Sequence, residues 1–258
     1  MFREEIENVG NAAKGKTEFL RKNPLGYFLA AMLAGLYVGL GILFTLTAGA
    51  FFTQGNVPGA KVIMGACFGV ALSLVIMAGS ELFTGNNFVM TVGALQKKIT
   101  WKQALQLWGV CWLGNLAGSI LLAVLYHLTG LGNGATGTMI AETALAKMSV
   151  EPLPLFVRGV LCNVLVCVAV WCGIKMKSES GKLIMIFWCL LTFFASGFEH
   201  SIANMTVIST ALLNPMEVAV TVGGFVYNLV IVTLGNMVGG ILFLAVPYYL
   251  IGREQKNS

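Results

Sequence analysis

Long apolar stretches alternate with short polar segments along this chain. The apolar stretches run over residues 26–52, 60–96, 104–128, 155–174, 183–213 and 218–251. An α-helix needs about 20 apolar residues to cross a bilayer, and at least five of these stretches are that long. The pattern therefore predicts an all-α membrane protein with six transmembrane helices.

The second and fifth stretches are too long for one straight crossing, since a helix rises about 1.5 Å per residue. Both also carry polar residues and glycine near their middle, at 80–87 and 196–201. Non-helical backbone survives at membrane depth only where protein or a water-filled cavity satisfies its polar groups. We therefore predict that helices 2 and 5 are broken at these two places.

Two short patterns occur once in each half of the chain. The triplet Leu-Gly-Asn stands at 113–115 and 234–236, and a Glu-x4-Asn pair stands at 81–86 and 199–204. Each half has three predicted spans, an odd number, so the second half enters the membrane upside down relative to the first. Inverted repeats with broken helices are a recurring transporter plan, with the substrate site at the midplane near the breaks.

The predicted organisation is a single membrane domain. Residues 1–24 form a cytoplasmic amphipathic segment, 25–130 the first repeat half, 150–252 the inverted second half, and 253–258 a cytoplasmic tail. Between the halves, residues 141–150 are interpreted as a short helix or re-entrant stretch.

Composition agrees with membrane residence. Of 258 residues, 57% are hydrophobic and 10% charged, whereas soluble domains carry about 25% charged residues. Thirteen of the 16 basic residues lie in one set of loops and ends: Arg3, Lys14, Lys16, Arg21, Lys22, Lys97, Lys98, Lys102, Lys175, Lys177, Lys182, Arg253 and Lys256. The positive-inside rule then places both termini in the cytoplasm. Topology explains the net charge of +5 better than nucleic-acid binding does.

The cysteines indicate neither a metal site nor a disulfide. All six lie in apolar stretches, without a CxxC pair or an accompanying acidic cluster: Cys67, Cys111, Cys162, Cys167, Cys172 and Cys189. They are interpreted as small apolar packing residues, and no cofactor is expected.

Few ionisable side chains fall within the predicted membrane region, where each is a functional candidate. Glu81 and Glu199 flank the two breaks, and we expect each carboxylate to cap a helix end. His200 adjoins the second break, where its imidazole could donate, accept or carry a proton; a structural bond to a backbone carbonyl is the alternative. Lys147 lies between the two halves.

Neutral donors complete the candidate site. Thr84 supplies a hydroxyl at the first break, and Asn163 and Asn204 supply amides nearby. Helix N-termini exposed at the breaks would add positive dipole ends. This set of donors suits a small anion better than a cation.

Three segments closely resemble the motifs of the formate/nitrite transporter family: Leu82 to Gly85, Leu161 to Trp171 and Ala195 to Met205. The resemblance covers essentially the whole chain. It implies an aquaporin-like fold assembled as a homopentamer in the bacterial cytoplasmic membrane, with one pore in each protomer.

The resemblance also implies roles for individual residues. Leu72, Leu82 and Phe83 would form a cytoplasmic constriction, and Phe68 and Phe193 a periplasmic one. Thr84 and His200 would lie between the two constrictions with Asn163 and Asn204 beside them. Lys147 would stand in the outer vestibule.

The short segment after His200 favours the nitrite or hydrosulfide branches of that family, and the chain is most similar to the hydrosulfide channels. The sequence thus predicts a channel for small weak-acid anions, best hydrosulfide, and no enzyme. A nitrite or formate channel or a proton-coupled anion symporter is one alternative. The membrane anchor of a redox enzyme is another, although haem anchors use histidine pairs and this chain has one in-span histidine.

Overall fold

The computed structural model describes residues 2–55 and 57–252, and within them all regular secondary structure is helical. The predicted tail 253–258 lies outside the described residues. The elements, in chain order, are α1 (Arg3–Lys22), α2 (Pro24–Gln54), α3 (Ala60–Met77), α4 (Phe83–Leu95), α5 (Trp101–Leu128), α6 (Gly134–Met148), α7 (Pro152–Lys175), α8 (Glu179–Ala195), α9 (Ser201–Leu213), α10 (Val222–Gly240), the π-helical turn η1 (Ile241–Ala245) and α11 (Val246–Gly252).

Within the part of the chain that the structure describes, five segments are long and apolar enough to cross a membrane: α2, α3, α5, α7 and the run from α10 to α11. Their starts follow from local sequence. Pro24 opens α2 behind an Asn23 side chain that accepts from the Gly26 N–H, and Thr100 and Gln103 form a capping box on α5. Such caps satisfy backbone donors that a helix start leaves free.

The chain leaves helical geometry twice inside the bundle. Helix α3 ends at Met77 and α4 begins at Phe83, while α8 ends at Ala195 and α9 begins at Ser201. Thr84 and Asn86 therefore belong to the first turns of α4 and not to the non-helical segment itself. The polar residues and glycine near 80 and 196 end one helix, and the next helix starts directly after them.

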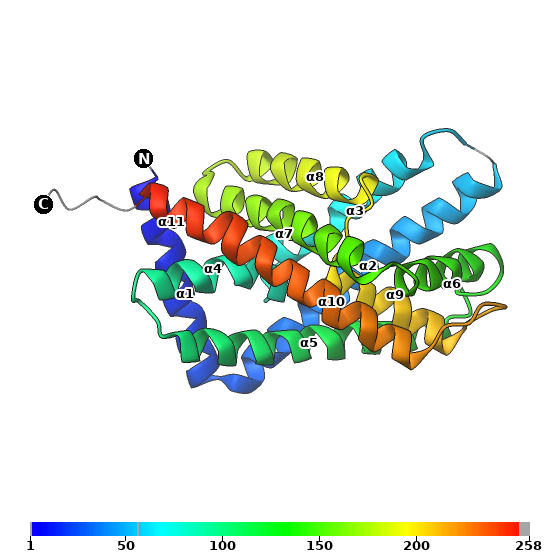
Figure 1. Ribbon diagram of the computed structural model, residues 1–258, viewed down its shortest axis with the longest axis horizontal. Helices are drawn as coiled ribbons and strands as arrows, with labels where there is room; N and C mark the ends of the chain where they lie inside the picture. Colours follow the sequence, from blue (N-terminus) through cyan, green and yellow to red (C-terminus); the bar gives the residue numbers. More distant parts are fainter. Residues whose placement is uncertain (1, 56, 253–258) are drawn as a thin grey trace, which may run out of the picture.

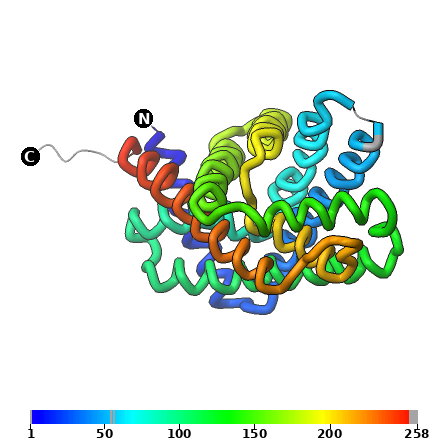
Figure 2. The backbone as a smooth tube through the Cα atoms, turned by 45° about the vertical axis from the view of Figure 1, so that its right-hand side comes forward, coloured from blue at the N-terminus to red at the C-terminus, as the bar shows by residue number. Residues whose placement is uncertain are grey.

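Helices α4 and α9 form the centre of the molecule. Residues 83–94 of α4 and 201–211 of α9 are buried on every side. Figure 2 shows the extended segment before α9 running through the middle of the bundle. The outer helices α2, α5, α7 and α10 surround this centre (Figure 1).

Glycines bring the outer helices together in pairs, at corresponding places in both halves. A Cβ added to Gly118 of α5 would lie 1.9 Å from the Met32 carbonyl oxygen of α2, and one added to Gly239 of α10 would lie 2.2 Å from that of Val160 in α7. Only glycine permits these approaches. Gly114 with Gly118 and Gly235 with Gly239 have the small-xxx-small spacing that lets helix backbones approach closely.

The structure extends the repeat beyond three helices in each half. Helix α1 packs against α4, and α6 packs against α9 in the same way. Each half therefore starts with a short peripheral helix that covers its own buried half-helix. The start of α1 and the end of α11 lie at one end of the bundle and α6 lies towards the other (Figure 1); we call these the terminal end and the distal end.

Three helix starts differ most from the sequence prediction. Helix α6 begins at Gly134, ahead of the expected segment 141–150, and α8 begins at Glu179, ahead of the expected start at 183. Helix α10 begins at Val222, after the expected start at 218. Thr221 caps α10 by accepting from the Gly224 N–H. This cap fixes the later start, because a run of apolar residues alone does not define where a helix begins.

Candidate functional site

Three cavities lie in series along the bundle. A distal cavity of about 450 Å³ is lined partly by Lys147, Glu199 and His200. A central chamber of about 10 Å³ follows. A terminal cavity of about 450 Å³ is lined partly by Lys16 and Glu81.

Shared lining residues identify the two barriers between these cavities. Phe68 and Phe193 line both the distal cavity and the central chamber. Their rings meet edge to face with centroids 5.5 Å apart. Leu72 and Leu82 line both the central chamber and the terminal cavity. A path through the protein therefore crosses one aromatic pair and one aliphatic pair.

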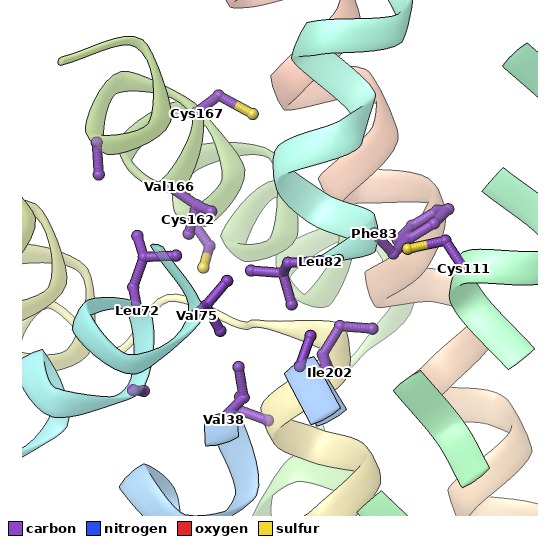
Figure 3. Packing of buried hydrophobic residues seen from close by; sticks show 14 of the residues in the cluster. Val38, Leu72, Val75, Leu82, Phe83, Cys111, Cys162, Val166, Cys167 and Ile202 are labelled. Carbon is purple, nitrogen blue, oxygen red and sulfur yellow. The ribbon is translucent and has the colours of Figure 1, made fainter. Parts of the chain in front are cut away.

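Phe83 lies elsewhere than the resemblance implied. Its side chain lines none of the three cavities and lies beside Cys111, on the side of α4 away from Leu72 and Leu82 (Figure 3). Its backbone N–H donates to the Asn115 side chain. Successive residues at the start of a helix point about 100° apart, so Leu82 and Phe83 cannot both face the path.

His200 is the polar side chain at the central chamber. It also lines the distal cavity and stacks on Phe193, with centroids 6.0 Å apart. Its Nδ1 accepts from the Ala203 N–H at 3.2 Å, and its Nε2 lies 2.9 Å from Thr84 Oγ1. Because Nδ1 is an acceptor, the neutral ring carries its proton on Nε2 and donates to Thr84.

Thr84 and Asn163 lie behind this histidine. The Asn163 amide donates to the backbone oxygens of Thr84 and Asn236, at 3.2 and 2.6 Å, and to Asn87 Oδ1. Asn163 is fully buried and lines none of the three cavities. It holds the start of α4 against α7 and α10, and the Thr84 hydroxyl is the part of this group that reaches His200.

Glu81 and Glu199 occupy corresponding positions, and the prediction that they cap helix ends is wrong. Helix α4 has no side-chain cap at its N-cap residue, and in α9 the capping group is His200 itself. Each carboxylate is instead paired with a lysine from the peripheral helix of its own half. Lys16 of α1 lies 2.6 Å from Glu81, and Lys147 of α6 lies 2.8 Å from Glu199.

An asparagine one turn into each half-helix completes these pairs. Asn86 donates to Glu81 at 2.9 Å and Asn204 donates to Glu199 at 2.7 Å. The remaining partners differ between the halves, since the Tyr27 hydroxyl donates to Glu81 whereas Asn228 accepts from Asn204. Both ends of the path thus have a lysine whose charge is shared with a nearly buried glutamate.

The asparagines of the Leu-Gly-Asn triplets hold the two breaks. Asn115 accepts from the Phe83 N–H and donates to the Ala31 and Glu81 carbonyls. Asn236 accepts from the Ser201 N–H and donates to the Gly159 and Glu199 carbonyls. Sequence reasoning found these asparagines as a repeat and missed their role, which the repetition itself could have suggested.

No group of three or more potential metal ligands occurs among the described residues. All six cysteines are free thiols, distributed through the packed helices. The polar groups that line the path include one imidazole and two lysine–glutamate pairs, a set that suits binding and passage of a small ion.

Comparison with known proteins agrees with this geometry. Residues 3–250 match the family model described as formate/nitrite transporter. The chain is 40% identical to the nitrite transporter NirC of Escherichia coli K12 over 250 residues, covering 96% of this chain and 92% of that protein.

Solved structures agree as well. A structure titled "FNT family ion channel" superposes with a TM-score of 0.91 at 38% identity, covering 96% of this chain and 98% of that one. A second, titled "Pentameric formate channel with formate bound", gives a TM-score of 0.77 at 30% identity over 90% of this chain and 98% of that one. This multi-pass membrane protein belongs to the formate/nitrite transporter family.

Proposed function

We propose that this protein is a channel for small monovalent anions of weak acids, and that hydrosulfide is its preferred substrate. The observation that carries the proposal is the central chamber, closed by two apolar pairs and supplied with one polar side chain, His200. Its volume of about 10 Å³ is close to that of one water molecule on the same measure. Hydrosulfide has a single heavy atom, whereas nitrite and formate each have three.

The barriers explain why a weak acid is favoured. A bare ion between apolar side chains loses its hydration, at a cost of several kcal/mol or more. An anion that takes up a proton on the way avoids most of this cost, which chloride cannot do at neutral pH. The Thr84 hydroxyl lines none of the three cavities; it accepts from His200 and so holds the imidazole that faces the chamber.

The charges at the two ends support passage of anions in either direction. Lys16 and Lys147 each present an ammonium group at a cavity of about 450 Å³. Their glutamate partners offset the charge of each lysine, which leaves the terminal cavity about neutral. The distal cavity keeps the charge of Lys61, which is unpaired among the described residues, enough to attract an anion there without a buried lone cation to trap it. Because Lys147 is paired with Glu199, its charge does not act alone on an approaching anion.

The assembly and orientation belong to the same proposal. We infer six membrane crossings, with α3–α4 and α8–α9 each counted as one, and cytoplasmic termini in a bacterial inner membrane. The lysine distribution supports this orientation. A homopentamer is supported by the similarity to a solved channel that is itself titled pentameric.

Two alternatives make different predictions. A proton-coupled symporter would move one proton with each anion and would run far more slowly than a channel. The redox-anchor alternative is disfavoured by family membership, since the relatives are transporters and channels.

The proposal is tested by flux into proteoliposomes, with hydrosulfide, nitrite, formate and chloride compared at two pH values. The weak-acid anions should pass and chloride should not. Equal flux of chloride and formate would overturn the proposal, and a fixed proton-to-anion ratio with slow turnover would favour the symporter.

Two substitutions of His200 separate its possible roles. The amide nitrogen of glutamine can replace Nε2, whereas the amide oxygen of asparagine can replace Nδ1. If donation to Thr84 is what passage requires, His200→Gln should retain most of the flux and His200→Asn should lose it. If His200 must carry a proton, both variants should lose the pH dependence of the wild type.

A further inference from the structure

The distal cavity is far larger than the proposed substrates require. Its volume is about 450 Å³, against about 10 Å³ for the central chamber. An apolar cavity of about 150 Å³ is enough to bind benzene. Ligand pockets in general span roughly 300–1,000 Å³ and are mostly apolar with a few polar groups. By size, this cavity is suited to a small organic molecule.

Its lining is also unlike that of a vestibule that only holds hydrated ions. Most of the surface is apolar, and the Phe194 and Phe198 rings come from the end of α8 and the break that follows it. Met64 of α3 and Met139 of α6 face the same space. Methionine side chains adapt to ligands of irregular shape and contact aromatic rings favourably.

The polar groups of the cavity include one unused positive charge. Lys147 is bonded to Glu199, but Lys61, also in the lining, has no hydrogen-bond or ion-pair partner among the described residues. Lys61 lies in the first turn of α3 and is exposed. An apolar cavity with an available ammonium group at its edge matches an anion that has a ring-sized apolar body.

We propose that the distal cavity binds amphiphilic organic monoanions, namely carboxylates or sulfonates carrying a six-membered ring, and that such a ligand blocks the path. The anionic group would pair with Lys61 while the ring packs against Phe194, Phe198 and Met139. Phe68 and Phe193 would stop the ligand, because the chamber beyond them cannot hold a ring. Blockage rests on the proposed function, whereas binding does not.

Benzenesulfonate and methanesulfonate are matched probes, since they share the charged group and neither is protonated near neutral pH. Isothermal titration of the purified protein should show benzenesulfonate binding at least about tenfold more tightly, because burying a ring removes a large apolar area from water. Lys61→Gln should weaken binding about threefold to fivefold, as for a partly exposed ion pair. Lys97→Gln, at the terminal end, should leave binding unchanged.

A second variant tests the apolar part. Met139→Ala should weaken benzenesulfonate binding and leave methanesulfonate unaffected. Equal affinity for the two probes, or equal effects of Lys61→Gln and Lys97→Gln, would overturn the proposal.

In proteoliposomes, benzenesulfonate should inhibit anion flux. Binding in a protein that conducts no anion would contradict the proposed function alone, and flux without binding would contradict this inference alone.

Discussion

Asn115 and Asn236 show how single side chains stabilise non-helical backbone inside a membrane protein. Each joins the first long helix of its half, the extended break and the start of the buried half-helix through three hydrogen bonds. Both are fully buried. Lipid offers no hydrogen bonds at membrane depth, so the backbone groups of the break that the protein covers need these partners.

At this scale we predict that Asn115→Ala and Asn236→Ala destabilise the protein to similar extents. Hydrogen bonds within membranes contribute about 0.6 kcal/mol each on average, so three lost bonds should cost about 2 kcal/mol. Thermal unfolding of the purified protein measures the effect. Asn214→Ala, which removes the half-exposed bonds of Asn214 to Gly132 and Asn133, is the control and should change the melting temperature little.

At the scale of elements, the peripheral helices α1 and α6 have equivalent positions. Each supplies one lysine to the glutamate that precedes the buried half-helix of its own half. The two glutamates are 12% and 7% exposed, so an unpaired carboxylate at either place would be nearly buried. Each lysine therefore also attaches its helix to the bundle.

We expect Lys16→Gln to loosen α1 and Lys147→Gln to loosen α6, with little effect on the other peripheral helix. Removing one partner of a buried pair costs about 3–5 kcal/mol. Hydrogen–deuterium exchange resolved by segment measures this directly. Lys98→Gln is a matched control, because Lys98 also binds α1, through Glu7 and Asn11, but in bonds that are all exposed. Uniform exchange across all three variants would refute the attachment role.

At the scale of the whole molecule, the two apolar barriers lie in series between cavities of equal volume. In a series path, the slower barrier limits flux. If the two barriers are of similar height, lowering one can raise flux by no more than about twofold, since the other then limits the rate. Lowering both removes that limit.

Phe193→Leu and Leu72→Ala should therefore each raise anion flux only slightly, while the double variant raises it by more than the product of the single effects. The same proteoliposome flux assay measures all three variants, and melting temperatures identify any variant that is poorly folded. A large increase from one substitution alone would mean that a single barrier controls the path.

Much of this protein could be predicted from the pattern of its sequence. Apolar runs of 20 or more residues leave few options besides membrane helices. The interruptions near residues 80 and 196 marked the breaks, since polar backbone at that depth has to serve a cavity. The recurring Leu-Gly-Asn and Glu-x4-Asn patterns marked equivalent positions in the two halves, and Asn115 and Asn236 make the same kinds of contact in each.

The tertiary structure alone decided which side chains meet. Lys16 and Glu81 are 65 residues apart, Thr84 and His200 are 116 apart, and no local pattern joins them. Whether Leu82 or Phe83 faces the path depends on the rotation of α4, which Asn115 fixes from another helix. Sequence determined the helices and their symmetry through burial and periodicity. The partners of the buried charges and the shape of the path arise only when distant helices pack together.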